Sequence, residues 1–312
     1  MKIIFFGSFQ YAVPALEALI KNGFEILAVV TNPDSLQGRK KELVASPVKI
    51  AAQEAGLKTF QPKTLKVKSG ISPTLDPRLL AREFSSGYMP DLLRSLNPNL
   101  GIVVAYSKII PKEILELFPK GVLNIHPSFL PAYRGPSPVQ TAILNGETET
   151  GATIMQVDKE VDHGPILAQI KYQIPPGAYY QQVTQELFQL GAKLLVKTIP
   201  DWLAGNITPQ PQDHSQATFT KKFSWQDGRI DWSQPAEKIY NQIRAFNPEP
   251  GTWTMLNGKI LKILKASLSK GSTLDLQKGR PLILEEVQPE GKKAMPFQDF
   301  LHGVGKKELK FE

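Results

Sequence analysis

The sequence contains no cysteine and only four histidines, at positions 126, 163, 214 and 302. The absence of cysteine excludes disulfides, thiol nucleophiles and thiolate metal sites. No two histidines have the spacing of a zinc site on one helix, so we expect no bound metal. The sequence therefore predicts neither a disulfide-stabilised fold nor a metalloenzyme.

Long apolar runs are also missing. No run is long enough to cross a bilayer, and the opening stretch of residues 1–7 is too short and too soon interrupted to be a signal peptide. We therefore expect a cytoplasmic chain with no membrane partner. The 41% hydrophobic and 21% charged content is ordinary for a globular protein. The formal net charge of +8 permits a polyanionic partner without proving one.

Short apolar runs alternate with helical patterns over the first 200 residues. Buried strands are expected at residues 2–6, 24–30, 100–106 and 122–126. The opening strand–helix–strand is a parallel crossover unit, but its turn, beginning at Gly7, lacks the G-x-G-x-x-G pattern of dinucleotide-binding proteins. We therefore predict an α/β domain with a Rossmann-like parallel sheet over residues 1–204, and we reject NAD as a cofactor.

The character of the chain changes after Gly205. Residues 206–212 are typical of an extended linker, and short strands separated by turns follow them. These strands are expected at residues 252–256, 259–265 and 282–287. The pattern predicts a small OB-like β-barrel as a second domain over residues 205–312, with the linker at about 204–213. Such barrel surfaces either face solvent or bind nucleic acid, and composition alone does not decide between the two.

The stretch from 121 to 146 combines a buried strand, a proline-rich loop and a helix. The strand ends in Asn124 and His126, which lie two residues apart and therefore point to the same side of the strand. This geometry places polar groups at the carboxyl edge of the sheet, where α/β proteins bind ligands. A second loop, residues 158–165, carries carboxylates, and one of these could orient the imidazole of His126.

No nucleophile accompanies these groups, because the chain has neither a cysteine nor a serine in a strand-to-helix elbow. The chemistry indicated is the direct transfer of an acyl-type group, with Asn124 and His126 donating to the developing oxyanion. The alternative is that both residues merely satisfy the strand end, which is the commoner role of a single buried histidine. The proline-rich loop and the carboxylate loop weigh against that alternative, but spacing alone does not name the substrate.

Three segments of the sequence resemble the formyltetrahydrofolate-dependent formyltransferases. They are residues 124–135 (NIHPSFLPAYRG), residues 151–155 (GATIM) and residues 162–164 (DHG). The resemblance implies a catalytic set of Asn124, His126 and Asp162, and 10-formyltetrahydrofolate as the formyl donor. It also implies a folate site lined by Ser128, Phe129, Leu130 and Pro131.

Within this family, the sequence is most similar to members that formylate the amino group of initiator methionyl-tRNA for translation initiation. Residues 31–49 look like the inserted loop that reads the acceptor stem, and the tRNA contacts implied there are Arg39, Lys40 and Lys41. Without the resemblance, the same basic loop is typical of a mobile, solvated segment. Residues 64–90 look like an insertion relative to the family, and the segment between 267 and 282 looks short. We expect a monomer that binds initiator methionyl-tRNA and folate.

Two other classes of function stay open. One is a formyltransferase that acts on a nucleotide sugar with the same three catalytic residues. The other is a folate-binding or RNA-binding protein without catalysis, against which the presence of Asn124, His126 and Asp162 argues.

Overall fold

The structure is a computed structural model, and it describes residues 1–38, 41–65, 89–269 and 281–304. Most of the insertion expected at 64–90, and most of the short segment between 267 and 282, lie outside these described residues.

The chain divides into two compact units, which are interleaved in sequence. The first consists of Met1–Arg134, Gly151–Lys171 and Gln185–Ala217. The second consists of Gly135–Thr150, Tyr172–Thr184 and Thr218–Glu312. The simpler boundary near residue 204 therefore stays a prediction.

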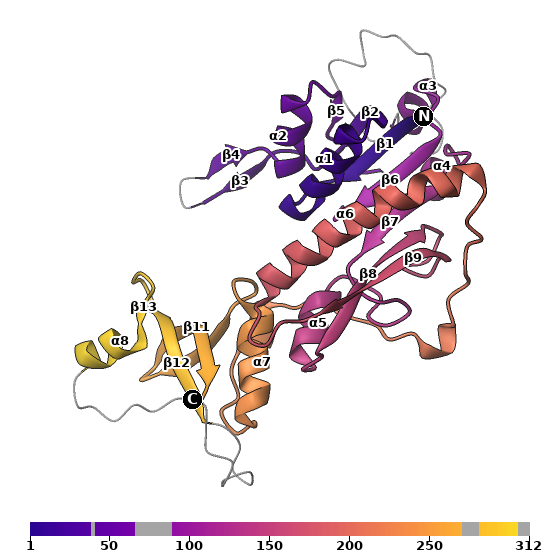
Figure 1. The fold of residues 1–312 in the computed structure, drawn as a ribbon. Coiled ribbons are helices and arrows are strands. Elements are labelled where there is room, and N and C mark those ends of the chain that lie inside the picture. The colour runs from indigo at the N-terminus through magenta and orange to yellow at the C-terminus, as the bar shows by residue number, and fades with distance from the viewer. Residues whose placement is uncertain (39–40, 66–88, 270–280, 305–312) are drawn as a thin grey trace. The chain divides into compact units, whose positions relative to one another are not determined.

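A seven-stranded sheet in the order β5-β2-β1-β6-β7-β8-β9 forms the main α/β layer (Figure 1). Its strands are β1 (Lys2–Gly7), β2 (Glu25–Val30), β5 (Thr59–Phe60), β6 (Leu100–Val104), β7 (Val122–His126), β8 (Glu149–Gln156) and β9 (Ile166–Gln173). The pairs from β5 to β7 are parallel, which confirms the predicted Rossmann-like sheet. The β7–β8 pair is antiparallel, with His126 opposite Thr153. The predicted parallel arrangement therefore holds from β5 to β7, and the β7–β8 pair departs from it.

Helices cover both faces of this sheet. They are α1 (Val13–Lys21), α2 (Pro47–Glu54), α3 (Met89–Ser95), α4 (Lys112–Leu115) and α6 (Tyr180–Ala204), while α5 (Pro138–Leu144) belongs to the second unit. Ser46 followed by Pro47 predicts a capped helix start, and Ser46 does cap α2, because its side chain accepts from the Lys49 N–H. Ser137 followed by Pro138 predicts the start of α5, and Ser137 is its N-cap residue, although its side chain makes no cap hydrogen bond. Pro200 predicts a break or kink in the long helix, and α6 continues through it to Ala204 without a break.

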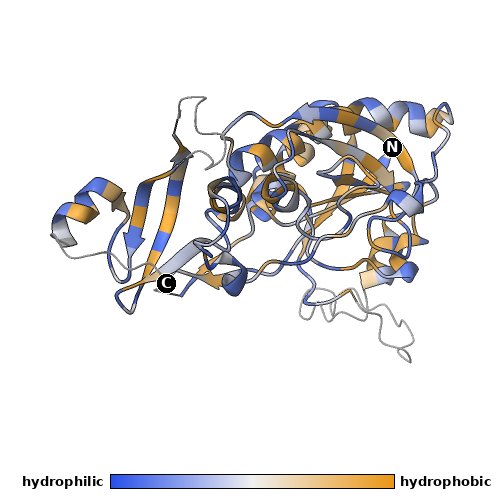
Figure 2. Ribbon diagram, turned by 90° about the horizontal axis from the view of Figure 1, so that it is seen from below, coloured by the Kyte–Doolittle hydropathy of each residue, from blue (hydrophilic) through white to orange (hydrophobic). Residues whose placement is uncertain are grey.

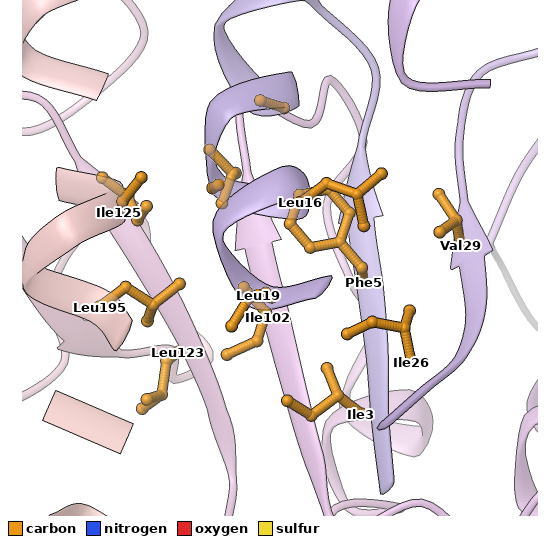
Figure 3. Packing of buried hydrophobic residues seen from close by; sticks show 14 of the residues in the cluster. Ile3, Phe5, Leu16, Leu19, Ile26, Val29, Ile102, Leu123, Ile125 and Leu195 are labelled. Carbon is orange, nitrogen blue, oxygen red and sulfur yellow. The ribbon is translucent and has the colours of Figure 1, made fainter. Parts of the chain in front are cut away.

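The apolar layer on one side of the sheet determines which face of β7 is free for chemistry. Leu123 and Ile125 belong to the cluster that packs on α1, α2 and α6, and Figure 3 shows them on the side of Leu195 of α6. A side chain at Gly191 would clash with Ile125, so the glycine allows α6 to approach β7. Because side chains alternate along a strand, Asn124 and His126 point to the opposite face.

A two-stranded hairpin, β3 (Ser35–Gln37) and β4 (Glu42–Val44), projects from the first unit (Figure 1). A mobile, solvated loop is the prediction for this segment from its residues alone, because it is basic, contains glycine and shows no apolar period. The structure has a hairpin instead, and its Leu36 and Leu43 side chains are exposed. The base of the hairpin is anchored by Asp34, which accepts from Lys49 Nζ at 2.7 Å and from Gln61 at 2.7 Å. These hydrogen bonds, with that from Lys49 the stronger, hold the pKa of Asp34 below its usual range.

The second unit contains a four-stranded antiparallel sheet in the order β10-β11-β12-β13, in the part of the chain for which a small OB-like β-barrel is predicted. Its elements are β10 (Thr252–Leu256), β11 (Lys259–Leu268), β12 (Leu282–Pro289), β13 (Met295–Pro296), α7 (Ala236–Phe246) and α8 (Phe297–Val304). Figure 2 shows hydrophilic and hydrophobic bands along its long strands, whereas the central strands of the larger sheet are hydrophobic over most of their length. The banding fits a sheet with one buried face. No helix in the described part of the chain has the length and apolar character needed to span a bilayer.

Candidate active site

His126 is the last residue of β7, and its side chain is held at both ring nitrogens. Nε2 lies 2.9 Å from the carbonyl oxygen of Tyr133, and Nδ1 lies 3.5 Å from Oδ1 of Asp162. Since a carbonyl oxygen only accepts, Nε2 carries the proton of the bond to Tyr133. The side chains of His126 and Asp162 are 5% and 14% exposed, so this pair is largely shielded from water. With its one proton on Nε2, a neutral imidazole presents a lone pair at Nδ1, which a carboxylate repels. An attractive contact between Nδ1 and Asp162 therefore requires a second proton, shared between the imidazole and the carboxylate.

Asn124 lies two residues before His126 on the same face of β7 and is half-buried. Among the residues that the structure describes, none forms a hydrogen bond with its side chain. Its amide N–H is therefore available to a ligand at the carboxyl edge of the sheet, beside the imidazole. The structure thus places all three predicted catalytic side chains in one region: Asn124 and His126 by strand register, and Asp162 by direct contact.

Asp162 reaches His126 from a tightly turned loop between β8 and β9. Its φ is +51°, and Tyr133, the residue on the other side of the imidazole, has φ of +63°. A left-handed backbone is uncommon for such residues and persists only where the surroundings enforce it. Gly164 completes the turn, because a Cβ there would clash with the carbonyl oxygen of Gln156. The contacts on both sides of His126 therefore depend on loops with unusual backbone geometry.

The proline-rich loop after β7 is tied to β8 and β9 by residues that sequence reasoning missed. Thr153 Oγ1 donates to the Ser128 carbonyl at 2.7 Å and accepts from the Leu130 N–H at 3.2 Å. Gln169 donates to the Leu130 carbonyl at 2.9 Å. Thr153 is fully buried, and a buried hydroxyl needs a hydrogen-bond partner, so a threonine at a buried strand position is a signal that could have indicated its role.

The four residues assigned to folate differ in accessibility. Ser128 and Leu130 are buried, Pro131 is half-buried, and Phe129 is exposed with Lys171 Nζ 5.5 Å from its ring centroid. Ser128 Oγ is already engaged with the Ala132 carbonyl at 2.7 Å. The folate contacts of all four residues stay predictions, and Phe129 is the member of the set whose side chain is most open to a ligand.

The predicted tRNA contacts are only partly described. Arg39 and Lys40 lie outside the described residues, whereas Lys41 is exposed at the turn of the β3–β4 hairpin with φ of +51°. The hairpin therefore presents at least one cation to solvent, and the tRNA role of all three residues stays a prediction.

Two models of the formyl transferase family match this sequence. The formyl transferase model covers residues 1–199, and the model of the formyl transferase C-terminal domain covers residues 222–305. The chain belongs to the formyl transferase family. It is an enzyme of the formyltransferase class, as the resemblance of residues 124–135, 151–155 and 162–164 implied.

Relatives match over almost the full length. The methionyl-tRNA formyltransferase of Chloroflexus aurantiacus is 43% identical over 97% of both chains, and that of Acidobacterium capsulatum is 40% identical over 97% of this chain and 96% of its own. Among solved structures, an N-formyltransferase of Helicobacter canadensis in complex with folinic acid and dTDP-3-aminofucose is 19% identical with a TM-score of 0.67, covering 93% of this chain and 99% of that one. The methionyl-tRNA formyltransferase of Clostridium thermocellum is 21% identical with a TM-score of 0.57, covering 93% and 98%. At these identities the two structures support the shared fold.

Proposed function

We propose that this enzyme transfers the formyl group of 10-formyltetrahydrofolate to the α-amino group of initiator methionyl-tRNA, giving N-formylmethionyl-tRNA. The observation that carries the proposal is the identity of 40–43%, over nearly the whole chain, with relatives named methionyl-tRNA formyltransferase. The contact of Asp162 with His126 on the same strand as Asn124 supports it, because formyl transfer needs donors to an oxyanion and a route for one proton.

In the proposed reaction the free amine attacks the formyl carbon, which forms a carbon–nitrogen bond and a tetrahedral intermediate. Asn124 donates a hydrogen bond to its oxyanion, and the Nε2–H of His126, which donates to the Tyr133 carbonyl in this structure, turns to the oxyanion as the second donor. Asp162 orients the imidazole from its Nδ1 side and assists proton movement. The intermediate collapses when the bond to N10 of the folate breaks, and the proton lost by the amine is delivered to N10. The formyl oxidation state is unchanged, so no redox partner takes part.

The second part of the proposal concerns the macromolecular substrate. Arg39, Lys40 and Lys41, which lie between β3 and β4 in the sequence, and the C-terminal domain hold the acceptor arm through phosphate contacts. The domain boundary near residue 204 is part of this proposal, and it is supported by family models that cover residues 1–199 and 222–305.

The deciding experiment offers the purified chain and 10-formyltetrahydrofolate two acceptors in parallel, initiator methionyl-tRNA and a dTDP-amino sugar. We expect formylation of the tRNA alone. Formylation of the sugar alone would instead favour a nucleotide-sugar enzyme, and binding of folate without turnover of either acceptor would favour a non-catalytic protein.

The tRNA contact is tested by Arg39→Ala. We expect weaker binding of initiator tRNA, unchanged folate binding, and a slope of log affinity against log salt that falls by about 1. A matched control is Lys193→Ala, which removes one exposed cation from α6. An equal loss of tRNA affinity in both variants would contradict a specific contact at Arg39, because the loss would then follow from the lower net charge alone.

A further inference from the structure

We infer that Gln212 and Arg134 are positioning residues. They hold the backbone at Tyr133 and at Asp162, the two residues that contact the ring nitrogens of His126. The inference rests on the proposed function, because it assumes that His126 and Asp162 act in formyl transfer. Neither residue was singled out in the sequence, where Gln212 falls in the segment predicted to be a linker.

Gln212 is buried, and its amide group is fully used. Nε2 donates to the carbonyl of Asp162 at 2.9 Å and to that of Gly164 at 2.7 Å. Oε1 accepts from Arg134 Nε at 3.1 Å and from Arg134 Nη2 at 2.7 Å. Arginine only donates and carbonyl oxygens only accept, so the partners themselves determine which way this amide points. The side chain thus links the catalytic loop to a buried cation.

Arg134 connects this link to the other side of His126. It follows Tyr133, whose carbonyl accepts from His126 Nε2 at 2.9 Å, while Asp162 faces His126 Nδ1 at 3.5 Å. The contacts therefore form a closed ring through His126, Tyr133, Arg134, Gln212 and Asp162. Tyr133 and Asp162 are the two residues of the ring with left-handed backbone, the kind of geometry that needs outside support.

A second connection runs from Arg134 to the same loop. Its Nη2 lies 2.8 Å from Nδ1 of His214, and that imidazole stacks on His163 with ring centroids 4.1 Å apart. His163 in turn contacts Asp158 at 2.6 Å. Because an arginine donates to Nδ1 of His214, that nitrogen is the acceptor in this arrangement. Arg134 is thus connected to this loop in two ways: through His214 to His163, and through Gln212 to Asp162.

The backbone anchors Gln212 in place. Gln210 and Ile166 exchange two backbone hydrogen bonds of 2.8 Å, which hold Gln210, two residues before Gln212, against the start of β9. Loss of the Gln212 amide would free the carbonyl of Asp162 and leave donors of Arg134, which is only 3% exposed, without their acceptor. The expected consequence is a less well placed carboxylate beside His126, because small errors of placement at a reacting centre cost large factors in rate.

The first test compares Gln212→Ala with Gln210→Ala under steady-state formylation of methionyl-tRNA. Gln210 is a matched control, since its exposed side chain donates only to the Thr208 carbonyl of its own segment among the described residues. We expect Gln212→Ala to lower kcat by about ten- to a hundredfold with both KM values within about twofold, and Gln210→Ala to leave kcat unchanged. An unchanged kcat in Gln212→Ala would overturn the inference, as would a loss that matches a lower folded fraction.

A charged variant separates positioning from simple support of Arg134. Gln212→Glu keeps an acceptor for Arg134 but replaces the N–H donors that face Asp162 and Gly164. We expect a melting temperature close to that of the parent, a kcat as low as in Gln212→Ala, and a displaced pH profile of kcat. Recovery of the parent kcat in Gln212→Glu would contradict the inference.

Asp162→Asn in the same assay distinguishes failure of the inference from failure of the proposed function. If Asp162→Asn retains full kcat, the proposed catalytic set is wrong whatever Gln212 does. If Asp162→Asn is strongly impaired and Gln212→Ala is normal, only the positioning role fails. If both single variants are impaired, the variant that combines Asp162→Asn with Gln212→Ala should have a kcat little lower than that of Asp162→Asn alone, because Gln212 acts through Asp162.

Discussion

The loop between β8 and β9 forms two histidine–aspartate contacts that differ in distance and setting. Asp158 lies 2.6 Å from Nδ1 of His163, with side chains 33% and 29% exposed. Asp162 lies 3.5 Å from Nδ1 of His126, with side chains 14% and 5% exposed. The shorter contact is thus the more solvent-exposed of the two, and the longer one lies at the carboxyl edge of the sheet.

This difference shows that a short distance does not identify a reacting pair. A partly solvated ion pair competes with water and adds little to stability or rate, whereas a shielded pair acts at a lower effective dielectric. Only His126 also shares a strand face with Asn124, an amide free to help bind an oxyanion. Setting and neighbours, more than separation, therefore distinguish the proposed catalytic contact from a structural one.

The strongest test of the comparison removes each imidazole in turn. We expect His126→Ala to lower kcat for methionyl-tRNA formylation by about a thousandfold or more, because it removes both an oxyanion donor and the partner of Asp162. We expect His163→Ala to keep kcat within about tenfold, since it loses the stack on His214 and the contact with Asp158, neither of which involves His126 directly. Single-turnover formylation measures both values.

Circular dichroism and folate binding serve as controls for the histidine variants, because His126 is buried and its loss must not be confused with unfolding. A folded His126→Ala with near-normal turnover would refute the catalytic assignment. Equal losses in the two variants would erase the distinction between the contacts.

A smaller effect is expected when the carboxylates are neutralised. Asp162→Asn keeps the size of the side chain but cannot stabilise a charged imidazole, so we expect a loss in kcat on the order of a hundredfold. Asp158→Asn removes the charge from a partly solvated contact and should change kcat less than threefold. Initial rates across a pH series measure both, and an Asp158→Asn that is as slow as Asp162→Asn would contradict the ranking.

Much of the fold followed from local pattern. Runs such as 122–126 predicted the buried strands because parallel strands are apolar on both faces, and Ser46 followed by Pro47 located α2. The β3–β4 hairpin was missed because its stability depends on anchors at its base, such as Asp34 with Lys49, which are distant from the turn itself. The sequence carries no local signal for such contacts.

The candidate site was predictable only in part, for a physical reason. Strand register alone placed Asn124 and His126 on one face, and the family resemblance supplied Asp162. Gln212 lies 50 residues from Asp162 in a proline-containing segment, where nothing local indicates burial. Contacts of that range are set by how the chain returns to the sheet, so they become visible only in three dimensions.

A third carboxylate, Asp227 in the second unit, tests whether hydrogen bonding alone marks a catalytic aspartate. Oδ2 accepts from the N–H and hydroxyl of Ser224 at 2.8 and 2.7 Å, and Oδ1 pairs with Lys221. The bonds from Lys221 and then Ser224 lower the pKa of Asp227 to about 2. A folded-state pKa below the unfolded value of about 3.9 stabilises the protein above about pH 4, and this contribution is lost as the pH falls toward 2.

Asp227→Asn should therefore lower the free energy of unfolding by about 1 kcal/mol at pH 7, a value reduced by the exposure of Lys221, and leave kcat unchanged. Thermal unfolding at pH 7 and pH 2.5 measures the difference, which should shrink at the lower pH because the parent carboxylate is then becoming protonated. A decrease of equal size at both pH values would assign the effect to packing. A large loss of kcat would instead mean that rich hydrogen bonding, and not a shielded position beside an imidazole, marks the functional aspartates of this chain.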